Sequence, residues 1–286
     1  MATAPIDISL SNITGNCQLK CSYNFNYNNS SCIATNRGDY IKLSYDKSSS
    51  PPVSYNAIGY DVEEIRIYTP SLHSYSDIKT EGELVIVHSS NTGAVPLLVC
   101  IPIKANNIAN VSSLFLKTVI DTVADSAPSD GESTTVNILK YNLTALVPKK
   151  PFFSYSATEP YQPCGSSVDY IVFAPLDASL DIMQETLTKL QSMIQSHAYD
   201  IKSGPNLFFN EKGPGTASGN DIYIDCQPVG TSSDSSEVIV DIAGTTTIND
   251  FFKNPLVQLF SASIVFIVIL YVTKMLLNGF QSTHGE

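Results

Sequence analysis

Two segments with apolar residues at every second position constrain the fold of this 286-residue chain most strongly. Residues 64–68 carry isoleucine at their second and fourth positions, and residues 83–87 carry leucine and isoleucine at the same two places. Successive side chains of a β-strand point to opposite faces of its sheet, so those at every second position share one face. We therefore predict two strands that direct Arg66, Tyr68 and Val85 toward one place.

These segments resemble a motif of the α-carbonic anhydrases. That family carries Gln-Phe-His-Phe-His on one strand and two outer histidines around Glu-Leu-His on the next. Here Tyr60-Asp-Val-Glu-Glu-Ile-Arg-Ile-Tyr68 is similar to the first motif, and His73 and His88 have the spacing of the outer histidines, with Glu83 in register. The resemblance covers roughly residues 4–225. It implies a mainly β fold with peripheral helices, built on a large, twisted, mostly antiparallel sheet.

The resemblance also implies that the zinc site of the family has been lost. The three zinc ligands of the family correspond to Arg66, Tyr68 and Val85. An arginine is always protonated and a valine has no lone pair, whereas catalytic zinc needs about three nitrogen, sulfur or oxygen ligands. From the sequence we therefore expect a pseudoenzyme, that is, not an enzyme, with no metal and no other cofactor.

Positions around the lost ligands change as well. The family's glutamate and threonine that orient its zinc-bound hydroxide correspond to Leu72 and Pro160. The resemblance gives His73 and His88, together with Glu83, a structural role in the core. Two interpretations of the altered ligand positions remain: a pocket converted to bind an anion or a peptide, or an ion pair of Arg66 with Glu64 or Glu83 that fills the former cavity. We favour the ion pair.

The resemblance predicts one disulfide. Cys17 and Cys164 match two cysteines that are paired in extracellular carbonic anhydrases. The alternative is two free thiols in a reducing cytosol, since no secretory signal is visible. Cys100 lies in an apolar run and is expected to be plain core.

The net charge of −11 limits the possible partners. A negative field repels polyanions, so nucleic acid is excluded and glycosaminoglycans are disfavoured.

An apolar segment near the C-terminus predicts a membrane anchor. Residues 254–273 contain no charge and lie between Lys253 and Lys274. About 20 such residues span a bilayer as a helix, although a buried core helix is the alternative. The predicted organisation is a carbonic-anhydrase-like domain at 1–228, a polar stalk at 229–253, a transmembrane helix at 254–277 and a short tail at 278–286.

Further elements are expected within the domain. Helices are predicted at residues 107–124 and 179–194, the latter capped by Ser179, and strands at 39–44, 96–103, 141–146 and 168–173. Pro102 suggests an end or irregularity in its strand.

The combination of a domain without its ligands and a membrane helix resembles the carbonic-anhydrase-like membrane proteins of large DNA virus particles, including the cell-surface-binding type of poxviruses. We therefore expect a non-enzymatic, tail-anchored protein of the virion membrane, present in host membranes during assembly. Its domain would bind another protein, either in a structural role between membrane and capsid or in attachment to a host receptor. The alternatives are a cellular carbonic-anhydrase-related subunit of a membrane complex and, less favoured, a residual carbonic anhydrase or esterase.

Overall fold

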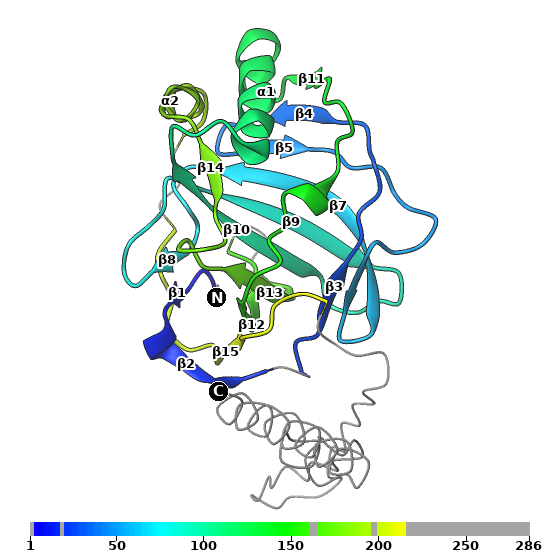
Figure 1. Ribbon diagram of the computed structural model, residues 1–286, viewed down its shortest axis with the longest axis vertical. Helices are drawn as coiled ribbons and strands as arrows, with labels where there is room; N and C mark the ends of the chain where they lie inside the picture. The colour runs from blue at the N-terminus through cyan, green and yellow to red at the C-terminus, as the bar shows by residue number, and fades with distance from the viewer. Residues whose placement is uncertain (1–2, 18–19, 161–164, 196–198, 216–286) are drawn as a thin grey trace, which may run out of the picture. The chain divides into compact units, whose positions relative to one another are not determined.

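The computed structural model describes residues 3–17, 20–160, 165–195 and 199–215 (Figure 1). These residues belong to one compact unit, residues 1–225, and residues 226–286 group separately. The predicted stalk, transmembrane helix and tail lie outside the described residues. Within the described ranges, no helix is long and apolar enough to cross a bilayer.

A mixed sheet of 13 strands dominates the fold, and its main path runs β11-β4-β5-β7-β9-β10-β13-β12-β15-β2. The strands of this path are β2 Ile13–Asn16, β4 Ile33–Asn36, β5 Ile41–Leu43, β7 Ile58–Tyr68, β9 Gly82–Ser90, β10 Leu97–Ala105, β11 Ser133–Thr135, β12 Phe152–Thr158, β13 Ser167–Phe173 and β15 Leu207–Asn210. Beside this path, β3 Tyr23–Phe25 pairs with β6 Val53–Tyr55, β6 also pairs with β7, and β14 Leu180–Ile182 pairs with β10. A separate two-stranded sheet joins β1 Asp7–Ile8 to β8 Ser74–Tyr75.

The two strands predicted first are central neighbours in the sheet. β7 and β9 pair antiparallel, with Arg66 opposite Val85 and Tyr68 opposite Glu83. A register shift between Val62 and Glu64 marks a bulge, which changes the face on which later side chains of β7 lie. The bulge explains why apolar residues occupy even positions before it and odd positions after it.

Both faces of the sheet carry buried side chains, which form two separate cores. Alternate residues of β9 enter different cores: Leu84 and Ile86 lie in one, and Val85 and Val87 in the other. Helices α1 Val111–Ser126 and α2 Gln184–Met193 contribute to the first core. Both lie at the end of the molecule that carries β4, β11 and β14, away from β1 and β2 (Figure 1).

The helices and strands depart from expectation at four places. Helix α1 begins at Val111 because Asn110 and Ser113 form a reciprocal capping box, so the expected start at residue 107 was early. The predicted helix from Ser179 is wrong in its first turn: Leu180 and Ile182 are buried in β14, which pairs parallel with β10, and α2 starts only after Met183.

Residues 143–145 form a 3-10 helix, Leu143–Ala145, rather than a strand, because the Asn142 side chain caps its first turn. Strand β10 does not end at Pro102, which lies opposite Glu83 inside the ladder. A short 3-10 helix, Leu10–Asn12, completes the set of elements in the described residues.

The predicted partner of Cys17 was wrong. Cys17 forms a disulfide with Cys21, whose Cα atom lies 5.5 Å from that of Cys17. This separation is within the range that a disulfide bridges, so the local pair forms without any long-range closure. Cys164, the partner expected from the resemblance, lies outside the described residues.

Candidate functional site

The structure brings the three predicted ligand positions together. Arg66 and Tyr68 lie two residues apart on β7, and Val85 is the cross-strand partner of Arg66 on β9. Partners in a ladder point to the same face, so the three side chains share one surface of the sheet. Tyr68 and Val85 both belong to the second core.

These three side chains do not fit a zinc ion. Arg66 Nε donates to Glu64 Oε1 at 2.5 Å, and Lys42 Nζ lies 3.1 Å from the other oxygen of that carboxylate. Burial raises the pKa of Glu64, but the charge of Arg66 and the hydrogen bonds from Lys42 and Arg66 outweigh it, so the pKa lies below its ordinary value. The guanidinium also lies over the ring of Tyr40, 5.1 Å from its centroid. Arg66 thus pairs with Glu64, and this cluster carries no set of metal ligands.

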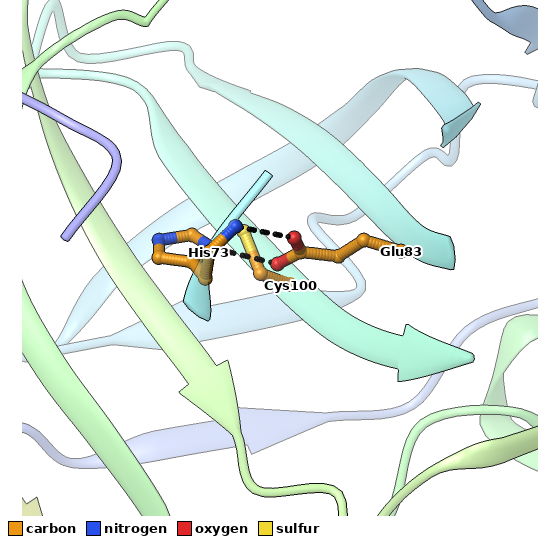
Figure 2. Close-up of side chains that lie close together, drawn as sticks. All are labelled: His73, Glu83 and Cys100. Carbon is orange, nitrogen blue, oxygen red and sulfur yellow. Dashed lines mark hydrogen bonds and ion pairs between the residues drawn. The ribbon is translucent and has the colours of Figure 1, made fainter. Parts of the chain in front are cut away.

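A second, fully buried cluster lies beside this one and contains His73, Glu83 and Cys100 (Figure 2). His73 directly precedes β8, Glu83 lies on β9 opposite Tyr68, and Cys100 lies on β10 opposite Val85. The ligand-type atoms of the three side chains all lie within 4.8 Å of one another. Three segments within residues 73–100 therefore place a nitrogen, a carboxylate and a sulfur at one buried point.

His73 is fixed from both sides of its ring. Nδ1 lies 2.7 Å from Glu83 Oε1, and Nε2 lies 2.6 Å from the hydroxyl of Tyr155. Burial raises the pKa of Glu83, but His73 through its charge and hydrogen bonds lowers it below the ordinary value. An ionised carboxylate can only accept, so Nδ1 carries a proton toward Glu83. Tyr155 stacks on Tyr170 at 4.4 Å and 3°, and the imidazole meets both rings edge-on.

Two further polar groups, the Cys100 thiol and the Tyr75 hydroxyl, lie beside Glu83. Burial, and then the charge of Glu83, raises the pKa of the Cys100 thiol well above its ordinary value. The hydroxyl of Tyr75 is buried, and no described residue lies in hydrogen-bonding geometry to it. Burial, and then the charges of Glu83 and Cys100, raises the pKa of this tyrosine as well.

The remaining predicted site residues lie elsewhere or carry no polar group. His88 lies on the opposite face of β9 from Glu83, with Nε2 2.9 Å from the hydroxyl of Tyr27 and Nδ1 3.1 Å from the carbonyl of Leu97. Leu72 is buried next to His73 in the chain, and Pro160 is buried beyond the end of β12. Neither side chain has a donor or an acceptor.

Cys100, Tyr75 and Tyr155 were not predicted as members of a site. Period two places Cys100 on the same face as Leu98, which was visible in the sequence. Its approach to His73 and Glu83 depends on the pairing of β9 with β10, which the sequence does not specify.

No family model and no curated protein matches this chain. Solved structures do. Dioscorin complexed with ascorbate is 16% identical with a TM-score of 0.63, covering 74% of this chain and 87% of dioscorin. The α-carbonic anhydrase of Thermovibrio ammonificans in complex with the inhibitor sulfanilamide is 17% identical with a TM-score of 0.60, covering 72% and 86%. The α-carbonic anhydrase of Photobacterium profundum is 16% identical with a TM-score of 0.60, covering 73% and 89%.

These findings correct the prediction that the chain is not an enzyme. The prediction rested on the side chains at positions 66, 68 and 85 and on the changes around them at Leu72 and Pro160. Structures of carbonic anhydrases share the fold, and the described residues contain a separate buried cluster of ligand-type atoms at His73, Glu83 and Cys100. The replaced ligands therefore do not decide whether the chain is an enzyme, and the exclusion is withdrawn. What the structural matches establish is the architecture: this chain has the α-carbonic anhydrase fold.

Proposed function

We propose that this chain is a protein of a virion membrane whose carbonic-anhydrase-like domain binds another protein. The observation that carries the binding role is the cluster of Arg66, Glu64, Lys42 and Tyr40, which lies on and next to the neighbouring strands β5 and β7. Arginine and tyrosine are the residue types that most often dominate the binding energy of protein interfaces.

The geometry of this cluster supports recognition. The side chain of Arg66 is 14% exposed and that of Lys42 is 32% exposed, so both cations are partly accessible. Glu64 accepts a hydrogen bond from Arg66 Nε, and the guanidinium carbon of Arg66 lies over the Tyr40 ring, 5.1 Å from its centroid. A charged group fixed in advance loses less conformational freedom on binding than a mobile one.

The membrane role is supported by the sequence of residues 254–277. Within this segment, residues 254–273 carry no charge and lie between Lys253 and Lys274, and their length and apolar character suit a bilayer-spanning helix. The pairing of such a segment with a carbonic-anhydrase-like domain is the arrangement of the membrane proteins of large DNA viruses that the sequence resembles. A structural role between membrane and capsid is the leading version, because the net charge of −11 disfavours attachment through polyanions.

Two measurements test this proposal. The first is detection of the chain in purified membrane-containing particles, followed by extraction at alkaline pH, in which a membrane-spanning protein stays with the lipid. If the chain is absent from the particles, the virion role is overturned. If the chain is found in a cellular membrane complex, the cellular alternative is favoured.

The second measurement compares two arginine variants in cross-linking of intact particles. Arg66→Ala is expected to reduce the yield of the cross-linked partner, whereas Arg37→Ala, at an exposed arginine outside the cluster, leaves it unchanged. Equal yields for both variants place the interface elsewhere and contradict the role of Arg66.

A further inference from the structure

We propose that His73, Glu83 and Cys100 bind one zinc ion at a position displaced from residues 66, 68 and 85. Imidazole nitrogen, carboxylate oxygen and thiolate sulfur are the three ligand types that zinc accepts in proteins. Here they come together in a buried site, within 4.8 Å of one another (Figure 2). This site is independent of the proposed binding role, because it uses none of the residues of the Arg66 cluster.

The charge balance of the cluster favours a cation. The Glu83 carboxylate is fully buried, and its oxygens lie 3.0 Å from the backbone nitrogen of His73 and 2.7 Å from its ring Nδ1. A buried carboxylate is costly unless a positive charge or several hydrogen bonds compensate it. Of the described residues, Lys79 brings a nearby ammonium group, but its Nζ donates to the carbonyls of Ser71 and Leu72 at 2.9 Å each. A divalent ion that takes the place of the Nδ1 proton would bring a positive charge directly to the carboxylate.

A second observation is the unpartnered hydroxyl of Tyr75. It is buried, and no described residue lies in hydrogen-bonding geometry to it. Zinc with three protein ligands keeps a fourth position for a water molecule or a small ligand. A hydroxyl group without a partner beside two of the ligands is suited to hydrogen-bond whatever fills that position.

Metal binding at this site has a defined proton balance. The thiol of Cys100 loses its proton to solvent as sulfur binds zinc. For Nδ1 of His73 to become a ligand, its proton moves to Nε2 if the ring is neutral, and Nε2 then donates to the Tyr155 hydroxyl, which now accepts. The Glu83 oxygen that accepted the Nδ1 proton becomes free to bind the ion. With a neutral ring one proton is released to solvent overall, and a protonated ring releases a second one.

The competing explanation is a hydrogen-bonded network without metal. His73, Glu83 and Tyr155 already satisfy one another, and in that case Cys100 is only a packed thiol. The two explanations differ in whether Cys100 is needed for metal binding.

The test uses the full chain in detergent, freed of metal with a chelator and then equilibrated with Zn²⁺ or Co²⁺. Cys164 and Cys226 are first replaced by alanine in every sample, so that thiols outside the described residues do not contribute. Cys100→Ala is compared with Cys32→Ala, a matched control at the other buried free cysteine of the described residues. Zinc is counted by mass spectrometry of the metal, and cobalt is read from its thiolate charge-transfer absorption.

The protein with alanine at positions 164 and 226 is the background protein. It and its Cys32→Ala variant are expected to bind about one zinc ion and to show the thiolate charge-transfer absorption band with cobalt. Cys100→Ala is expected to lose the band and the tightly bound ion, while circular dichroism in the presence of chelator shows that it folds. Tyr155→Phe, which removes the partner of the His73 ring, should weaken affinity about 10- to 100-fold. A background protein that takes up no metal, or a Cys100→Ala variant that binds it as tightly as the control, overturns the site.

Discussion

His73 binds the Glu83 carboxylate with two of its own groups: the backbone nitrogen lies 3.0 Å from Oε2 and the ring Nδ1 lies 2.7 Å from Oε1. The two residues are ten positions apart in sequence and both are fully buried. One side chain on β9 thus fixes both the backbone and the ring of the residue that precedes β8. The loop between β7 and β9 is held to the sheet at this point.

Glu83→Gln should lower the free energy of unfolding by about 1–3 kcal/mol, because an amide satisfies only part of these contacts and brings a donor into a buried site. Urea unfolding, monitored by tyrosine fluorescence, measures this change in the free energy of unfolding, because the chain has 15 tyrosines and no tryptophan. Glu211→Gln, at an exposed glutamate, is the control and should change stability little. Equal stabilities of the two variants would contradict the structural importance of the His73–Glu83 contact.

The buried His88 should make stability depend on pH. Burial lowers its pKa to about 4, against about 6.5 in the unfolded chain. Between these values the unfolded state binds the additional proton, so the contribution of neutral His88 is complete above about pH 6.5 and is lost as the pH falls toward 4. The loss amounts to about 3 kcal/mol.

Unfolding of the wild type and of His88→Gln from pH 4 to 7 isolates this contribution, because the carboxylates titrate in both proteins. The wild type should lose more stability than the variant as the pH falls. Parallel profiles would show that His88 has an ordinary pKa.

The Cys17–Cys21 disulfide can be identified by peptide mapping. Trypsin cleaves after Lys20, so an unreduced digest should contain residues 1–20 covalently joined to residues 21–37. Fragmentation of this pair distinguishes Cys21 from Cys32 on the second peptide. A link from residues 1–20 to a peptide containing Cys164 would restore the pairing expected from the sequence. Because the bridge closes a short loop, Cys21→Ala should destabilise the fold by only about 2 kcal/mol.

Gly82 should not tolerate a side chain. A Cβ atom at this position would lie 2.6 Å from the backbone oxygen of Tyr68, in the ladder that also positions Glu83. Gly82→Ala is therefore expected to cost about 1–3 kcal/mol through displaced backbone. Gly165→Ala is the matched control, since no atom lies within 4 Å of its added Cβ. If both substitutions cost the same, β7 and β9 approach less closely at this point than described.

Much of the central sheet could be predicted from the sequence. The alternating residues around 65–67 and 84–86 identified β7 and β9. Every second side chain of a strand shares a face, and Ile65, Ile67, Leu84 and Ile86 pack into the first core. The start of α1 was misplaced by a few residues, because the reciprocal cap formed by Asn110 and Ser113 was not considered. The helix predicted at residues 179–194 was wrong in its first turn for a different reason: Leu180 to Ile182 pair with the C-terminal end of β10 as strand β14.

The sequence by itself determined the alternation that builds the sheet, the net charge that disfavours polyanions, and the identity of the side chains at positions 66, 68 and 85. Each of these is a local property of the chain. Tertiary structure decided that Arg66 pairs with Glu64, that Cys17 joins Cys21, and that Cys100 and Tyr75 lie beside His73 and Glu83. These contacts depend on which strands are neighbours and in which register, and several registers satisfy the same alternating pattern until all the strands of the sheet pack together.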